Sequence, residues 1–393
     1  MAQHHGVMSL FTDHPRARWA APAAAVAAVA AGTLVTNLTA SADPSLPPRS
    51  AAQLLADVQR AQLAYVSGTV VQSADLGLPD LSALGGRQGS SSLQSVVTGT
   101  HTWRVWYGGE QQQRLALVGS LGESDVIRNG RDLWLWSSDQ KTAEHYRLPA
   151  KPAGQTHGAQ AGGPSSPRAT DLPKTPEEAA QRALAALDPT TAVTTSGSSV
   201  VAGRSAYDLV LKPRDTASLV ASVRISVDAQ RHIPLRVQAY STKRANPAFE
   251  VGFTSIDFGR PDARQFAFNP PPGTKVTEHP VTAPDKAKEQ GKDKVRPKGA
   301  PTVVGKGWAA VAVGTLPPGA LTSGSTTSGS TSGQRGQGDQ LQALLKNLPR
   351  VSGSWGSGRL MNGTLFSAVL TDDGRYAVGA VKPETLYAAL AAK

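Results

Sequence analysis

The stretch SVRISVDAQRHIPLRVQAYS, residues 222–241, alternates apolar and polar side chains on both sides of a short turn. Val223, Ile225 and Val227 are separated by polar residues, and the alternation resumes after the turn at residues 228–231. Successive side chains of a strand point to opposite faces, so the pattern predicts two antiparallel strands with one buried face.

The same signal extends outward in both directions. Strands are predicted at residues 65–73, 96–107, 114–117, 125–128, 133–137, 145–148, 200–201, 205–211, 220–228, 235–240 and 249–257. Asn129-Gly130 predicts a hairpin, and helices are predicted at residues 51–63, after the N-cap Ser50, and from the N-cap Thr175. A sheet of so many strands curls. The predicted fold is α+β: a strongly curved antiparallel sheet, an incomplete barrel, with helices covering its concave face.

Composition narrows the possible partners. The net charge of +11 is compatible with nucleic-acid binding, but the dense basic run at residues 285–299 has interleaved acids and no aromatic residue. We interpret that run as a solvated linker and expect no nucleic-acid partner. The basic pI of about 9.9 instead favours an anionic membrane surface or wall polymers. Without cysteine, the chain has neither disulfides nor the acylated residue of a lipoprotein.

The N-terminus predicts export across the cytoplasmic membrane. Arg16 and Arg18 precede an uncharged Ala/Val/Leu-rich stretch at residues 19–42, which ends in the small residues Ala-Ser-Ala before Asp43. This is the layout of a secretory signal peptide. An uncleaved signal anchor is the alternative, because the stretch is long enough to span a bilayer. Either form places the rest of the chain outside the cytoplasm, secreted or anchored.

Composition changes divide the chain. Residues 1–42 are the signal peptide or anchor, 43–49 a spacer, and 50–278 the main domain, which contains a Pro/Gly/Ser-rich loop at 150–173. A basic linker follows at 279–302. The predicted small C-terminal α+β domain, residues 303–393, contains a disordered Ser/Thr/Gly loop at 321–338, a helix at 339–348, a hairpin turn at 372–374 and a last helix at 383–391.

No sequence motif of catalysis or cofactor binding is present. The chain lacks HExxH, GxSxG, a Walker loop, CxxC and a dinucleotide glycine pattern. Its histidines are scattered, so a surface or structural role is favoured over metal ligation. We therefore expect neither an enzyme nor a cofactor nor a metal.

Apolar side chains instead concentrate on neighbouring predicted strands. A curved sheet with two short helices as cover can enclose an apolar hollow, and a filled core is the alternative for any single residue. The predicted lining is Trp103, Val105, Leu115, Leu117, Trp134, Tyr207, Leu209, Val223, Ile225, Phe249, Val251 and Phe253. A lid is predicted in the apolar loop at residues 73–86, with packing against the sheet as the alternative. Its leucines are Leu76, Leu78, Leu81 and Leu84.

Three stretches resemble the LolA/LolB/LppX superfamily. They are DVIRNGRDLWLWSSDQ (residues 125–140), SVRISVDAQRHIPLRVQAYS (222–241) and QFAFNPPPGTKV (265–276), which resembles the family's closing Phe-x-Phe-x-Pro-Pro-x-Gly signature. The resemblance covers about residues 50–278. It implies non-enzymatic binding of acyl lipid or a lipoprotein in the cell envelope. The Ala/Gly/Arg-rich composition is typical of a high-GC actinobacterium.

The C-terminal stretch GRYAVGAVKPETLYAALA, residues 374–391, is similar to the end of the RseB/MucB family. That family combines a LolA-like domain with a second domain. The similarity implies the alternative function, regulation of an envelope-stress or sporulation sigma factor through a membrane anti-sigma partner.

Overall fold

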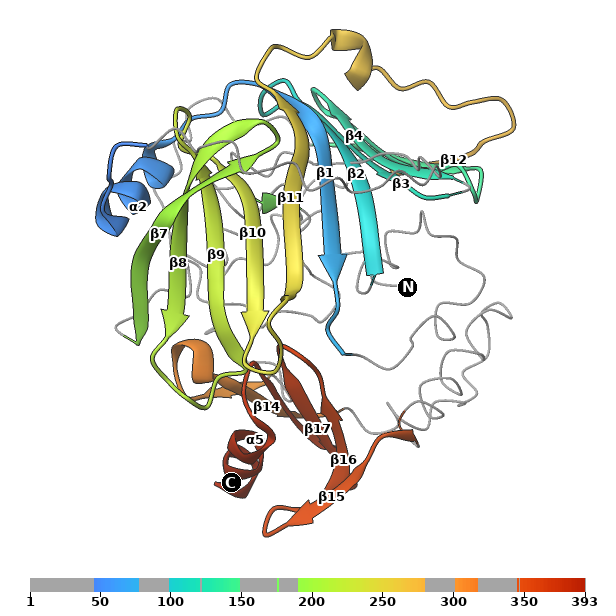
Figure 1. The fold of residues 1–393 in the computed structure, drawn as a ribbon. Coiled ribbons are helices and arrows are strands. Elements are labelled where there is room, and N and C mark those ends of the chain that lie inside the picture. The colour runs from blue at the N-terminus through green and yellow to red at the C-terminus, as the bar shows by residue number, and fades with distance from the viewer. Residues whose placement is uncertain are drawn as a thin grey trace, which may run out of the picture.

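The computed structural model describes residues 46–77, 99–120, 122–148, 175–176, 190–279, 301–316, 345 and 347–392. They form a twelve-stranded sheet and a six-stranded sheet (Figure 1). The predicted export segment, both predicted low-complexity loops, nearly all of the predicted linker and most of the helices expected after Thr175 and at residues 339–348 lie outside the described residues.

The large sheet is open and curved, and it does not close into a barrel. Its strand order is β12-β6-β5-β4-β3-β2-β1-β11-β10-β9-β8-β7, so β1 lies between β2 and the distant β11. The strands are β1 (Val66–Ala74), β2 (Gly99–Tyr107), β3 (Gln112–Val118), β4 (Glu123–Asn129), β5 (Asp132–Ser137), β6 (Thr142–Arg147), β7 (Thr191–Val201), β8 (Arg204–Pro213), β9 (Val220–Asp228), β10 (Pro234–Ser241), β11 (Pro247–Asp257) and β12 (Lys275–His279). The predicted fold class is confirmed.

The turn between β9 and β10 shows how local residues set the register. Asp228 Oδ1 accepts hydrogen bonds from the backbone N–H groups of Gln230 and Arg231, which is the local bond that favours Asp in turns. His232 then takes a left-handed conformation, with φ of 58°. The chain reverses there, and Val237 comes to lie opposite Ile225 as the alternation predicts.

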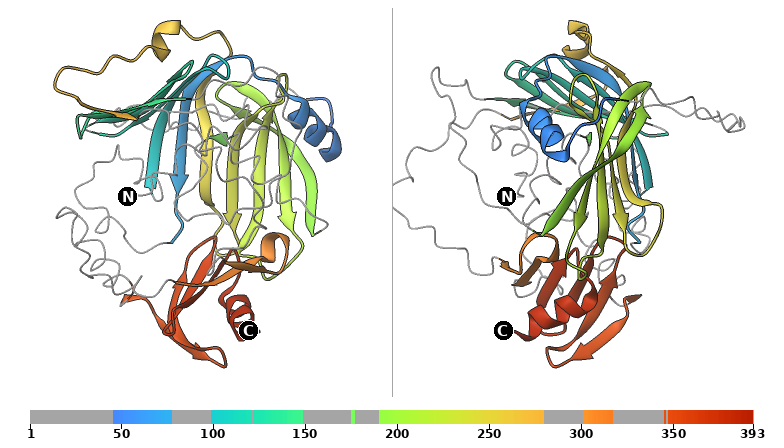
Figure 2. Two further views of the ribbon diagram at one scale, coloured as in Figure 1. Left: turned by 180° about the vertical axis from the view of Figure 1, so that it is seen from behind. Right: turned by 60° about the vertical axis from the view of Figure 1, so that its left-hand side comes forward.

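Helix α2 (Ala51–Arg60) begins at the predicted N-cap. Ser50 Oγ accepts from the N–H of Gln53, and Gln53 Oε1 accepts from the N–H of Ser50, forming a capping box. The helix ends three residues before the predicted residue 63, because Ala61 is extended. Leu54 is fully buried, and α2 lies against one side of the sheet near β7 (Figure 2).

One strand of the large sheet was not predicted. After β11 the chain forms the 3₁₀ turn η3 (Ala263–Phe266) and returns as β12, which pairs with β6 in parallel. The other strand pairs of the large sheet are antiparallel, as predicted. Phe266 is buried, and its ring lies 3.1 Å from the point where a Cβ at Gly108 would stand, so a side chain there would press on the ring. The crossing segment thus packs on the sheet.

The small sheet has the order β13-β14-β18-β17-β16-β15. Its strands are β13 (Thr302–Val304), β14 (Val311–Thr315), β15 (Arg350–Gly353), β16 (Gly356–Asn362), β17 (Ser367–Thr371) and β18 (Arg375–Gly379), with the short turn η4 (Gly307–Ala309). The predicted hairpin turn at residues 372–374 and the last helix, α5 (Pro383–Ala391), are confirmed. In the described part of the chain, no helix has the length and hydropathy needed to span a membrane.

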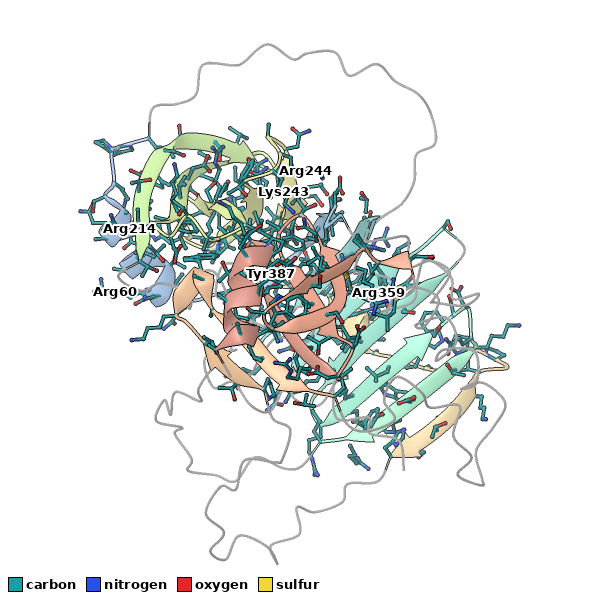
Figure 3. All side chains as sticks on the ribbon, turned by 90° about the horizontal axis from the view of Figure 1, so that it is seen from below. Arg60, Arg214, Lys243, Arg244, Arg359 and Tyr387 are labelled. Atoms are coloured by element: carbon teal, nitrogen blue, oxygen red, sulfur yellow. The ribbon has the colours of Figure 1, made fainter. Side chains whose placement is uncertain are left out.

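The two sheets touch at the lower end of the large sheet. The N–H of Leu219 donates to Ala380 O at 2.8 Å, and the N–H of Lys382 donates to Ala217 O at 2.9 Å. Seen from below, Lys243 and Arg244 mark the same junction (Figure 3), where Lys243 Nζ donates to the carbonyl of Gly363 at 2.6 Å. Backbone and side-chain bonds therefore both hold the small sheet in place.

Candidate ligand-binding face

The register of the strands places nearly all predicted lining residues on one face of the large sheet, called the apolar face below. Trp103 of β2 lies opposite Val70 of β1 and Leu117 of β3. Directly opposed residues share a face, so this row and its alternate neighbours define the apolar face across the sheet. The predicted residues on it are Trp103, Val105, Leu115, Leu117, Tyr207, Leu209, Val223, Ile225, Phe249, Val251 and Phe253.

These side chains belong to one hydrophobic cluster. All are buried except Leu115 and Phe253, which are half-buried at its margin. Among the described residues, cover from outside the sheet comes from residues 46–63 at one end and from the small-sheet side chains Trp308, Leu365, Phe366 and Ala380 at the other. Helix α2 belongs to the first group and the tip between β16 and β17 to the second.

Beyond β3 the same face carries polar side chains beside the apolar Val126, Leu133 and Leu135. Arg128 of β4 lies opposite Gln113, while Glu144 and Tyr146 of β6 occupy the far margin. The Tyr146 hydroxyl donates to Glu144 Oε2 at 2.5 Å, and its ring stacks on His279 of β12 with centroids 4.2 Å apart. Burial, followed by the Glu144 contact, raises the pKa of Tyr146, and burial lowers the pKa of Arg128. One continuous face thus has an apolar part and a polar part.

Trp134, the remaining predicted lining residue, lies on the opposite face. It is paired with Ile127 and His145, and it stacks on the His145 ring with centroids 4.0 Å apart. Phe268, from the segment between η3 and β12, covers it at a centroid distance of 5.2 Å. The Phe-x-Phe motif therefore closes this opposite face, and Trp134 is separated from the other lining residues.

The opposite face also holds a buried charged cluster that no sequence pattern indicated. Arg114 Nη2 contacts Asp125 Oδ2 at 2.5 Å and Glu123 Oε1 at 3.2 Å, while the guanidinium lies 5.2 Å from the Trp106 ring centroid. The Asp125 side chain is fully buried. Burial raises its pKa to about 8 against the opposing effect of Arg114. Burial thus favours the protonated form of Asp125, and Arg114 favours the carboxylate.

The structure describes one of the four predicted lid leucines, Leu76. Leu76 is buried in the same hydrophobic cluster as Trp103, immediately after β1. Its carbonyl accepts a 2.7 Å hydrogen bond from the N–H of Thr364 in the small sheet. Leu78, Leu81 and Leu84 lie outside the described residues, so the lid stays a prediction.

Titratable side chains do not gather into a metal site. Across the described ranges, no group of three or more His, Asp or Glu residues could hold a metal ion. His145 instead lies between two carboxylates, 2.7 Å from Glu278 and 3.0 Å from Asp132, and so connects β12 to the sheet.

No family model matches the sequence, and no curated protein matches it either. Solved structures with a similar fold include the Pseudomonas aeruginosa MucA/MucB complex, at 16% identity and a TM-score of 0.39, covering 86% of this chain and 96% of that chain. An uncharacterized conserved protein from Thermus thermophilus matches at 11% identity and a TM-score of 0.31, with 58% and 99% covered. A LolA superfamily protein from Nitrosomonas europaea matches at 10% identity and a TM-score of 0.21, and the match covers 56% of this chain and 99% of that chain. Both families that the sequence motifs resemble thus recur among these structures. All three TM-scores lie below 0.5, so function is argued from this chain's own residues.

Proposed function

We propose that this protein is a non-enzymatic binding protein of the cell envelope that holds the acyl chains of a lipid or lipoprotein on the apolar face. The observation that carries the proposal is the register itself, which gathers the predicted lining residues onto one side of an open, curved sheet. The extracytoplasmic location rests on the predicted export segment. No catalytic step is part of the proposal.

The physical basis is the hydrophobic effect. Each methylene removed from water contributes about 0.8 kcal/mol, so a chain of about sixteen carbons contributes roughly 12 kcal/mol before entropic costs are subtracted. Aliphatic and aromatic side chains are sufficient for this binding, and the apolar face consists of them. Transfer of the lipid from the molecule that delivers it to the one that receives it then requires only a difference in their affinities for the lipid.

The direct test is saturable uptake of a fluorescent fatty acid by the chain from Asp43 onward. Leu115→Ala truncates a half-buried side chain on the apolar face, and Val71→Ala truncates a half-buried one on the opposite face as the matched control. We expect Leu115→Ala to weaken binding by about three- to tenfold, since it removes apolar contact area, and the control to have little effect. Equal effects of the two variants, or no saturable uptake by the wild type, would contradict the proposal.

A second candidate function concerns the small sheet. Both of its edges, β13 and β15, are open within the described residues, and Val303 and Val304 on β13 are exposed by 49% and 38%. An open edge can pair with an extended segment of another protein. These observations favour a protein partner of the anti-sigma type, as the sequence alternative implies. Loss of partner crosslinking in Val303→Lys, with fatty-acid uptake retained, would support this role, and unchanged crosslinking would contradict it.

A further inference from the structure

The indole N–H of Trp103 is buried without a hydrogen-bond acceptor. The side chain has no exposed surface, and Nε1 has no partner in the part of the chain that the structure describes. A buried donor that loses water without gaining an acceptor costs about 1–3 kcal/mol. Such a group in a folded protein needs an explanation, and one of them is a ligand that supplies the acceptor.

The described neighbours of Trp103 are mostly apolar. Its direct neighbours across the sheet are Val70 and Leu117, and Val105 is the next residue on the same face of β2. The nearest polar side chains on the face are Gln72 and His101, one row away. The buried Gln72 Oε1 does not accept from the indole N–H in this structure, although the Gln72 side chain has another interaction. The backbone groups of these strands bond within the sheet. Within the described ranges this indole has no acceptor, and a bound molecule can supply one.

The position of Trp103 within the face indicates what kind of molecule. On one side, across β1, lie Phe253, Val251 and the apolar rows of β10, β9 and β8. On the other side, the row of Trp103 continues beyond Leu117 through Ser124 on β4, Ser137 on β5 and Thr142 on β6. The neighbouring rows of the same face hold Val126, Leu133 and Leu135 as well as Arg128. Trp103 thus lies close to the boundary between the apolar part and the polar part. An amphiphile would place the junction of its tail and head at such a boundary.

We propose that Trp103 Nε1 donates a hydrogen bond to the carbonyl oxygen of a bound acyl group, with the hydrocarbon tail over β1 and β11 to β8 and the polar head over β4 to β6. This inference rests on the proposed function and makes it more specific. Trp103 becomes a specificity residue, which separates acyl esters and amides from hydrocarbons of equal length. An ester of glycerol and the acyl group of a lipoprotein share this carbonyl, and both fit the proposal.

The test uses two probes that differ in the ester group: a pyrene-labelled alkane and the methyl ester of the corresponding pyrene-labelled fatty acid. Affinities of the full exported chain are measured by fluorescence titration for the wild type, Trp103→Phe and Trp106→Phe. Trp106 lies on the same strand but on the opposite face, so it is the matched control. A diacylglycerol and a synthetic acylated lipopeptide serve as further ligands to separate the two sources of the carbonyl.

We expect Trp103→Phe to weaken ester binding by about three- to tenfold, the range for loss of one neutral hydrogen bond. Alkane binding should change much less, and the control should alter neither. Replacement of Trp103 by benzothienylalanine, which has sulfur in place of the N–H and keeps the ring shape, should give the same result if Trp103→Phe folds poorly.

Two outcomes would overturn the inference while leaving the proposed function intact. If both probes weaken equally, Trp103 contributes contact area only; if neither changes, the N–H has no carbonyl partner. If the wild type binds neither probe, the proposed function fails and the inference fails with it. Melting curves without ligand add a check, because the benzothienylalanine variant should be at least as stable as the wild type if the protein itself supplies no acceptor.

Discussion

Ser241 Oγ donates a 2.6 Å hydrogen bond to the carbonyl of Thr364, and this contact joins the large sheet to the small one. Both residues are buried. The N–H of Thr364 in turn donates to the carbonyl of Leu76, at the end of β1, so the tip between β16 and β17 is bonded to two strands of the large sheet. The tip also carries Leu365 and Phe366, which pack on the hydrophobic cluster of the apolar face.

Ser241→Ala should therefore lower the stability of the whole chain. The Thr364 carbonyl would lose a buried donor, at a cost of about 1–3 kcal/mol, and both sheets should still unfold in one transition. Urea denaturation followed by tryptophan fluorescence and by circular dichroism measures both effects. Ser255→Ala, at an exposed position of β11, is the control. Two separate transitions in the wild type would show that the junction does not couple the sheets.

Asp125 should make stability depend on pH. Its pKa is raised from 3.8 to about 8, chiefly by burial, so the folded state retains a proton that the unfolded chain releases. The stabilising contribution is full below pH 3.8 and is lost as the pH rises toward 8. Asp125→Asn should flatten this decline in urea denaturation across the range, and the exposed Asp257→Asn should not. A decline of equal slope in Asp125→Asn would rule out this origin.

Phe266→Ala should be among the most destabilising substitutions on the opposite face. The side chain is 1% exposed and packs against Gly108, so its removal leaves a cavity and costs about 3–5 kcal/mol. Arg264→Ala, with a side chain 90% exposed in the same 3₁₀ turn, should change the free energy of unfolding by less than about 0.5 kcal/mol. Similar midpoints for the two variants in urea would mean that the crossing segment does not stabilise the sheet.

His145→Ala should loosen β12. The imidazole lies between Asp132 and Glu278 and is the side-chain link from the sheet to this edge strand on the opposite face. Hydrogen exchange followed by mass spectrometry should show faster exchange at residues 275–279 than in the wild type. Arg147→Ala removes an exposed side chain from β6, the strand of His145, at a site 3.8 Å from Asp132. This control should leave the amides of β12 protected from exchange. Unchanged exchange in His145→Ala would show that the backbone ladder alone holds the strand.

Much of the large sheet follows from alternation along the chain. Strands β8 to β11 were predicted because each has one apolar and one polar face, and the register confirms that their apolar sides coincide. Two parts of the sheet could not be predicted from alternation. The stretch 191–199 is rich in Thr, Ser and Gly, yet it is most of β7, since pairing with β8 supplies its hydrogen bonds. β12 follows a Pro-rich segment, and its parallel partner is over a hundred residues earlier in the chain, so no local signal exists.

The site was predictable up to the point where a strand is apolar on both sides. In β5, Leu133 and Leu135 alternate with Trp134 and Trp136, so the pattern alone cannot assign a face. Only the register through β4 shows that Trp134 shares a side with Ile127 and lies away from Trp103. Asp125 was likewise predicted to lie on a strand, but its burial was not predicted. Its burial depends on Arg114 and on the neighbouring strands, which sequence periodicity does not reveal.

The central place of β1 sets the order in which the chain can fold. Strands β1 to β6 are consecutive neighbours. The second partner of β1 is β11 at residues 247–257, and the second partner of β6 is β12 at residues 275–279. A chain that emerges N-terminus first therefore exposes two unpaired edges until nearly three quarters of its length is available. Contacts between residues so distant in sequence slow folding, because the entropic cost of closing the loop comes before the contacts can stabilise the chain. Assisted folding after synthesis is the expected consequence, and refolding in isolation should be slow and dependent on protein concentration.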